Sequence, residues 1–180
     1  MKTNGYTATK RDRGKHCFPS SALVRTPHGY EVICKLNAGD SVICYDELSG
    51  TFGAREVTRR IEYPAAILWD IRMVGLPVPV ATTASNPFLT TSGWKSAIHL
   101  APSDQLIAFD EHGGVKHETV LSVNVTDRRQ AVYNLHTAGD HSYIVVGLIV
   151  HNFVYFLTFR TQWHRLFIDP PQKAARRHAA

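Results

Sequence analysis

The residue types best suited to chemistry stand at the two ends of a long central segment: a cysteine near its start and a histidine–asparagine pair at its end. The thiolate of Cys17 could attack the peptide carbonyl that precedes it and turn the amide into a thioester. The side-chain amide of Asn152 could attack its own main-chain carbonyl, while His151 hands a proton to the leaving amine. We therefore predict a chain that cuts its own backbone, provided that the segment between these residues brings its two ends together.

That segment contains an internal repeat. Residues 26–71 match residues 90–135 without a gap, at an offset of 64 residues, and the clearest stretch sets 36–47 against 100–111. Two copies are too few for a solenoid, so we interpret the repeat as a pseudo-twofold domain built from two similar units. Asp40 and Asp104 fall at equivalent turns, and we predict that both have a structural role there.

The repeated units are predicted to be β-strands. They consist of short runs rich in β-branched and aromatic residues, separated by Gly, Asp, Asn or Pro. The expected strands cover 31–34, 41–45, 66–72, 105–109, 120–125, 131–135 and 142–146. Together they predict an all-β fold in one domain, which is large enough to bury a substantial core.

The repeat also separates the three cysteines. Cys34 faces Ile98 and Cys44 faces Ala108, so we expect both to be buried as small hydrophobic residues. Cys17 lies before the repeat and is the candidate nucleophile. With no CxxC pair, a zinc knuckle or a disulfide framework is disfavoured, and the ten scattered histidines make a metal site the weakest alternative.

Charge is concentrated at the two ends of the chain. The formal net charge is +5, but residues 1–16 and 153–180 each carry five Lys or Arg and one acid, which leaves a net charge of −3 for 17–152. The composition therefore gives no support to a nucleic-acid partner. Neither a signal peptide nor an apolar run long enough for a bilayer is visible. A cytoplasmic location is the default expectation, and secretion without a classical signal stays open.

The last segment of the chain changes character. Aromatic and basic residues recur at helical spacing over 153–168, and two prolines follow, so we predict a C-terminal amphipathic helix over 153–171 and a disordered basic tail over 172–180. This helix either packs on the sheet or contacts a membrane surface or a partner protein. Residues 1–16 form a basic leader.

Four segments together resemble a Hint domain, the fold shared by inteins, bacterial intein-like domains and Hedgehog autoprocessing domains. The resemblance covers 17–152 and is most like a bacterial intein-like autoprocessing domain. Its motifs are Cys17-Phe18-Pro19 with 22–26, the stretch 36–40, Thr83-Ala84-Ser85-Asn86 followed by 87–94, and 132–135 with 139–152, which ends in Val150-His151-Asn152. The resemblance implies an all-β, pseudo-twofold Hint-type fold, in agreement with the repeat.

The family's chemistry transfers to these positions unevenly. Thr83 matches the first residue of the family's Thr-x-x-His motif, but Asn86 stands where the histidine should be. An asparagine can donate a hydrogen bond to an oxyanion, yet it cannot protonate a leaving amine, so we expect a slowed first step or help from another histidine. The alternative interpretation of Asn86 is an ordinary turn residue before Pro87.

The second step keeps its groups. His141 resembles the upstream histidine that assists asparagine cyclisation, and both His141 and His151 can titrate near neutral pH. The alternative for His141 is a structural turn histidine. Phe153 follows Asn152 and offers no nucleophile, so the expected outcome is cleavage without ligation.

We therefore expect a monomeric, cofactor-free domain that performs single-turnover self-cleavage, with its own flanking segments as substrate. One alternative is a degenerate Hint scaffold or interaction module without cleavage activity. Another is Hedgehog-like transfer of the N-terminal segment to an external nucleophile, which Cys17-Phe18-Pro19 suggests and the intact His151-Asn152 disfavours.

Overall fold

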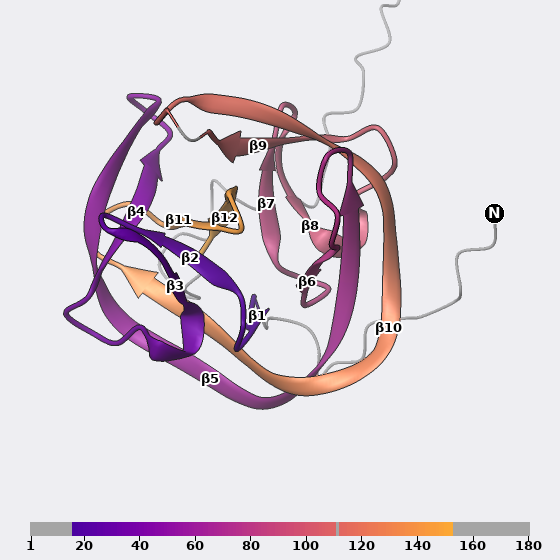
Figure 1. Cartoon of the computed structure of the whole chain (residues 1–180), viewed down its shortest axis with the longest axis horizontal. Helices are drawn as coiled ribbons and strands as arrows, with labels where there is room; N and C mark the ends of the chain where they lie inside the picture. The colour runs from indigo at the N-terminus through magenta and orange to yellow at the C-terminus, as the bar shows by residue number, and fades with distance from the viewer. Residues whose placement is uncertain (1–15, 111, 153–180) are drawn as a thin grey trace, which may run out of the picture.

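Two long, curved strands frame the part of the chain that the computed structural model describes, residues 16–110 and 112–152. These are β5 (Thr51–Met73) and β10 (Val115–Thr137), which pair antiparallel over most of their length. Figure 1 shows that both strands bend around the shorter strands. Their register shifts at several points, the largest between Val125 and Arg129, and such β-bulges let a long ribbon curve.

The shorter strands lie within this frame. They are β1 (Phe18–Pro19), β2 (Leu23–Thr26), β3 (Gly29–Val32), β4 (Ser41–Asp46), β6 (Val80–Thr82), β7 (Pro87–Thr90), β8 (Gly93–Ser96), β9 (Gln105–Phe109), β11 (Ser142–Val145) and β12 (Leu148–His151), and two 3-10 turns accompany them, η1 (Ile33–Lys35) and η2 (Ala97–His99). Together with β5 and β10 the short strands form one sheet in the order β3-β2-β11-β12-β7-β9-β10-β5-β4, with β1 beside β10, β6 beside β5 and β8 beside β7. The all-β prediction is confirmed.

The internal repeat reappears in the elements. β2, β3, η1, β4 and β5 begin 64 residues before β7, β8, η2, β9 and β10, respectively. The two turn aspartates form equivalent hydrogen bonds, each to the backbone amide three residues earlier. Asp40 Oδ2 accepts from the Asn37 amide at 2.7 Å, and Asp104 Oδ2 accepts from the Ala101 amide at 2.9 Å. Both aspartates therefore have the predicted structural role.

The core lies between the framing strands and the short strands. It includes Val24, Phe88, Leu106 and Leu135, each fully buried. Cys44 is fully buried as predicted, whereas Cys34 is only partly buried. Burial raises the pKa of the Cys44 thiol to about 12, which the nearby Thr137 hydroxyl partly offsets, so this thiol stays protonated.

Several predicted boundaries differ from the structure. The strand expected over 31–34 begins earlier and ends in η1, and the strands expected over 120–125 and 131–135 are two parts of β10. The charged stretch between them has the composition of a loop. It nevertheless continues the strand across a β-bulge, because β10 pairs with β5 on both sides of that bulge. The predicted helix over 153–171 and the tail over 172–180 lie outside the described residues, as do residues 1–15.

Candidate active site

The backbone of Cys17 is bound by the segment that follows β6. Its amide donates to Thr83 Oγ1 at 3.0 Å, and its carbonyl accepts from the Thr83 amide at 3.0 Å and from Thr82 Oγ1 at 3.2 Å. Next to it, β1 pairs with β10 through Phe18 and Tyr133. Cys17 is fully buried. Thr83 thus holds the nitrogen that would leave in an N-to-S shift, as the family motif suggests.

Asn86 lies in the same segment. Its Nδ2 donates to Thr82 Oγ1 at 2.8 Å, so one of its two N–H groups supports Thr82. The side chain is 1% exposed, and its Oδ1 accepts no hydrogen bond from the described residues. Asn86 is therefore a buried positioning group behind Cys17, with an acceptor that nothing in the described chain satisfies.

His16, which precedes Cys17, is also part of this end of the site. Its Nδ1 lies 2.7 Å from the Ser85 carbonyl, and because a carbonyl only accepts, Nδ1 must carry the proton. Burial lowers the pKa of His16, which keeps the ring neutral at neutral pH. The residue whose carbonyl would be attacked is thus anchored by its own side chain.

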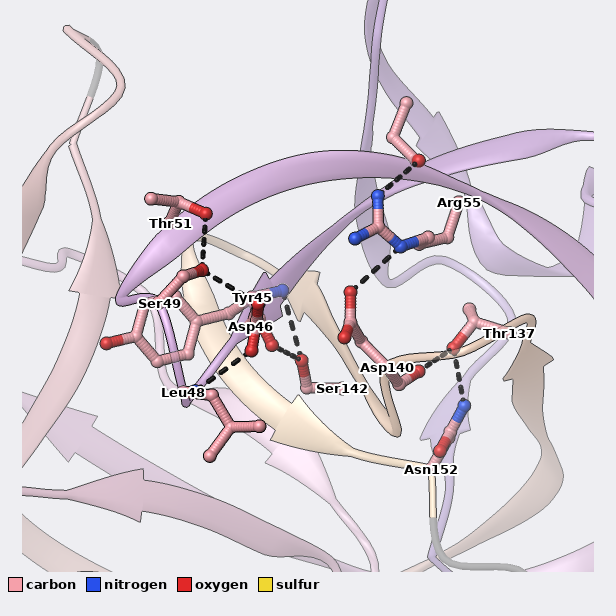
Figure 2. A network of polar contacts seen from close by, with 11 residues as sticks. Tyr45, Asp46, Leu48, Ser49, Thr51, Arg55, Thr137, Asp140, Ser142 and Asn152 are labelled. Atoms are coloured by element: carbon pink, nitrogen blue, oxygen red, sulfur yellow. Dashed lines mark hydrogen bonds and ion pairs between the residues drawn. The ribbon is translucent and has the colours of Figure 1, made fainter.

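Asn152 follows β12 and is held by the segment after β10. Its backbone amide donates to the His141 carbonyl at 2.8 Å, and its side-chain amide lies 2.8 Å from Thr137 Oγ1 (Figure 2). With the amide turned so that Nδ2 faces the His141 carbonyl at 2.8 Å, Oδ1 accepts from the Thr137 amide at 2.9 Å. The opposite orientation would set an N–H group against another N–H, so we assign this one.

Thr137 is itself fixed by the turn that it begins. Its hydroxyl donates to the Asp140 carbonyl at 2.6 Å, and the Asp140 carboxylate pairs with Arg55 Nε at 2.9 Å. Figure 2 shows this line of contacts from Arg55 on β5 through Asp140 and Thr137 to Asn152. The Asn152 side chain therefore lies at the end of a connected line of polar contacts.

His151 is buried between two rings. Trp94 meets it edge-on, with ring centroids 5.0 Å apart, and His141 stacks on it with centroids 6.0 Å apart. The Trp94 indole N–H donates to Glu47 Oε1 at 3.0 Å, which fixes the orientation of that ring. His141 is exposed, whereas His151 is 9% exposed.

Burial lowers the pKa of His151 to about 3, and the neighbouring His141 and His16 add to this effect. The prediction that His151 titrates near neutral pH is therefore wrong. At neutral pH it is a neutral imidazole with one N–H donor and one lone pair.

The two ends meet in the fold. His16 lies close enough to His151 to influence its ionisation, and Cys17 acts in the same way on Tyr143, whose pKa is raised first by burial. Tyr143 pairs with Val150 in the hairpin that carries His151. The six predicted residues thus fall into two adjacent groups: Cys17, Thr83 and Asn86, and then His141, His151 and Asn152.

Sequence reasoning missed several residues that build the site, namely His16, Thr82, Trp94 and Thr137. For Thr137 a signal exists. The repeat sets it against Met73 at the end of the equivalent strand, so a buried polar residue replaces a buried apolar one. The same comparison sets Asn86 against Ala22.

Within the described ranges, no three His, Cys, Asp or Glu side chains are grouped as metal ligands would be. No helix in those ranges has the length and apolar character of a membrane span.

The strand order and the meeting of Cys17 with His151-Asn152 define an intein-type fold. A DnaB intein from a Synechocystis species superposes with a TM-score of 0.70 at 17% identity, covering 77% of this chain and 99% of the intein. A bacterial intein-like domain from Clostridium thermocellum gives 0.65 at 24% identity, covering 76% and 98%. A DnaX mini intein from Spirulina platensis gives 0.66 at 21%, covering 76% and 99%.

The family model described as the pretoxin Hint domain matches residues 23–153, which is most of the chain. The chain therefore belongs to the pretoxin Hint domain family. No protein with a curated description matches its sequence significantly.

Proposed function

We propose that the domain cleaves its own backbone after Asn152 by asparagine cyclisation and does not ligate the flanks. The observation that carries this proposal is the binding of Asn152. Its backbone amide and its side-chain Nδ2 both donate to the His141 carbonyl, while its Oδ1 faces the Thr137 amide. A side chain that is already fixed in this way loses little further conformational entropy when the succinimide ring closes.

In the proposed step, Nδ2 bonds to the main-chain carbon of Asn152 and the bond to the Phe153 nitrogen breaks. One proton moves from Nδ2 to that nitrogen, and a C-terminal succinimide remains. The Thr137 amide stabilises charge on Oδ1 as Nδ2 loses its proton. Neutral His151 supplies an N–H to the carbonyl oxygen under attack, whereas the sequence led us to expect that it gives a proton to the leaving amine.

The N-terminal step is part of the proposal at a lower rate. The Cys17 sulfur bonds to the His16 carbon, the peptide bond between them breaks, and the Cys17 nitrogen takes a proton. Thr83 holds that nitrogen, but Asn86, which donates one N–H to Thr82, cannot protonate it. A thiol would then release residues 1–16 from the thioester. Since Phe153 offers no nucleophile, neither step leads to ligation.

The substrate in this proposal is the chain's own flanking segments. The family is described as a pretoxin Hint domain, and a self-cleaving unit that separates the segments on either side of it fits that description.

Intact mass of the full chain over time tests the C-terminal step. We expect a fragment ending at residue 152 that is lighter by one water than the hydrolysis product, because cyclisation adds no water. Asn152→Ala should abolish the fragment. Asn124→Ala removes an exposed asparagine of β10 and should leave its rate unchanged.

A folded wild-type chain that keeps residues 153–180 would instead support the second candidate, an inactive Hint scaffold. The full burial of Cys17 and the presence of Asn86, which cannot act as an acid, favour that candidate at the N-terminal end.

A further inference from the structure

Every contact described for the Asn152 side chain comes from one turn, residues 137–141. The Thr137 amide and hydroxyl lie within 2.9 Å of it, and the His141 carbonyl lies 2.8 Å from it. The turn needs Gly139, whose φ is +76°. Whatever fixes this turn therefore fixes the nucleophile.

The turn is held from outside by β5. The Ala138 amide donates to the Glu56 carbonyl at 2.9 Å, and Arg55 Nε pairs with the Asp140 carboxylate at 2.9 Å. Asp140 is thus bound at two points, since its carbonyl accepts from the Thr137 hydroxyl and its carboxylate forms an ion pair with Arg55. A shift of the carboxylate would move the carbonyl that orients the Thr137 hydroxyl.

Arg55 is itself closely fitted. Its Nη1 donates to the Ala54 carbonyl at 3.0 Å, and a Cβ on Gly53 would lie only 2.8 Å from that nitrogen. A Cβ on Gly139 would lie 3.8 Å from Nε. The guanidinium therefore lies against two glycines that leave space for it.

The ion pair contributes little to stability for its own sake. The side chains of Arg55 and Asp140 are 38% and 22% exposed, and solvent screens the attraction between charges this exposed. Its position behind the turn gives it a different importance, since small displacements of a reacting group slow a reaction far more than they destabilise a fold.

We propose that Arg55 and Asp140 are positioning residues for the cyclisation of Asn152, acting through the turn that holds its side chain. The inference rests on the proposed function. Neither residue exchanges a proton in the reaction: Nδ2 of Asn152 bonds to its main-chain carbon, the bond to Phe153 breaks, and the proton passes to the leaving nitrogen.

The test compares the rate of loss of residues 153–180 in the full chain, by intact mass, among matched variants. We expect Arg55→Gln and Asp140→Asn each to slow cleavage about tenfold, and Arg55→Lys to recover part of the rate. Arg128→Gln is the matched control, because Arg128 forms an ion pair of similar exposure with Asp70 farther from Asn152 along the strand pair. It should cleave like wild type.

Two further readouts separate positioning from loss of folding. Release of residues 1–16 by dithiothreitol should be unchanged in Arg55→Gln, whereas a weakened fold would alter both ends. In NMR spectra, the side-chain amide protons of Asn152 should exchange with solvent faster in Arg55→Gln than in wild type or Arg128→Gln. The Asn152→Ala spectrum identifies these signals.

An unchanged cleavage rate in Arg55→Gln, or equal slowing at both ends, would overturn the inference. If wild type does not cleave, the proposed function fails by itself. The amide exchange still decides whether Arg55 orders Asn152, and equal exchange in Arg55→Gln and wild type would refute it.

Discussion

The Cys17 end and the Asn152 end of the site are each held by a threonine, but they are held in different ways. Thr83 binds the backbone nitrogen and carbonyl of Cys17. The Thr137 amide binds the side-chain oxygen of Asn152, and the His141 carbonyl accepts from Nδ2, the proposed nucleophile. The first arrangement fixes the bond to be broken, whereas the second fixes the side chain that would attack. The difference explains why we assign efficient chemistry to only one end.

The supporting groups differ in the same direction. At the Cys17 end, one N–H of Asn86 donates to Thr82, and its Oδ1 has no hydrogen-bond partner within the described chain. At the Asn152 end, a line of contacts reaches from Arg55 through Asp140 and Thr137 to the Asn152 side chain, although Asp140 Oδ2 also accepts no hydrogen bond there. The two ends therefore differ in what the contacts reach: backbone groups of Cys17 at one end, and the side chain that carries the proposed nucleophile at the other.

The largest expected effect comes from giving the Cys17 end the acid that it lacks. Asn86→His should speed the release of residues 1–16 by dithiothreitol about 100-fold, because an imidazole can protonate the leaving Cys17 nitrogen. The rate is measured by intact mass in an Asn152→Ala background, so that only the first step is followed.

Asn86→Gln is the matched control for this prediction. It enlarges the same side chain without adding an acid, and it should stay near the wild-type rate. Equal rates in the His and Gln variants would show that the missing proton donor does not limit the Cys17 end.

The second prediction concerns the pH dependence of stability, because both ends of the site contain a buried histidine that is neutral: His16 at one end and His151 at the other. The pKa of His151 is about 3 in the folded protein, against about 6.5 in an unfolded chain. Between these values the unfolded chain binds more protons. The free energy of unfolding therefore has its full value above about pH 6.5. It falls as the pH decreases toward about 3, by about 1.4 kcal/mol per pH unit for one such histidine.

Urea unfolding of Asn152→Ala between about pH 8 and about pH 5 measures this slope. His16 and His136, whose pKa values are also lowered by burial, should steepen it. His151→Gln should reduce the slope, and His28→Gln, at an exposed position, should not. An equal dependence of stability on pH in Asn152→Ala and in its His151→Gln and His28→Gln variants would contradict a buried, neutral His151.

The contrast between the two ends also shows how far the sequence leads. The residue types and order of Cys17 and His151-Asn152, with the repeat, were enough to predict the all-β fold and the candidate nucleophiles. The ionisation of His151 was not predictable, because it depends on burial and on neighbours that are distant in sequence. The supports behind Asn152 were missed for the same reason, since Arg55 reaches it only through the pairing of β5 with β10.

The smallest expected effect lies outside both ends and tests whether fold stability alone sets the difference. Val146 begins the two-residue turn between β11 and β12 with a φ of +51°, although a β-branched residue strongly disfavours that region. Turns of this kind prefer Asn before Gly, and Gly147 already follows. Val146→Asn should raise the free energy of unfolding by about 1 kcal/mol, as measured by urea unfolding.

Val78→Asn makes the same substitution at an exposed valine without a positive φ, and it should leave the stability unchanged. In a more stable Val146→Asn protein, the rates of cleavage at the two ends should keep their wild-type ratio. The ratio of the two cleavage rates would change if the slow step at Cys17 resulted from opening of the whole β11–β12 hairpin. A constant ratio would show instead that the contacts that hold Cys17 and Asn152 set the difference between the two rates.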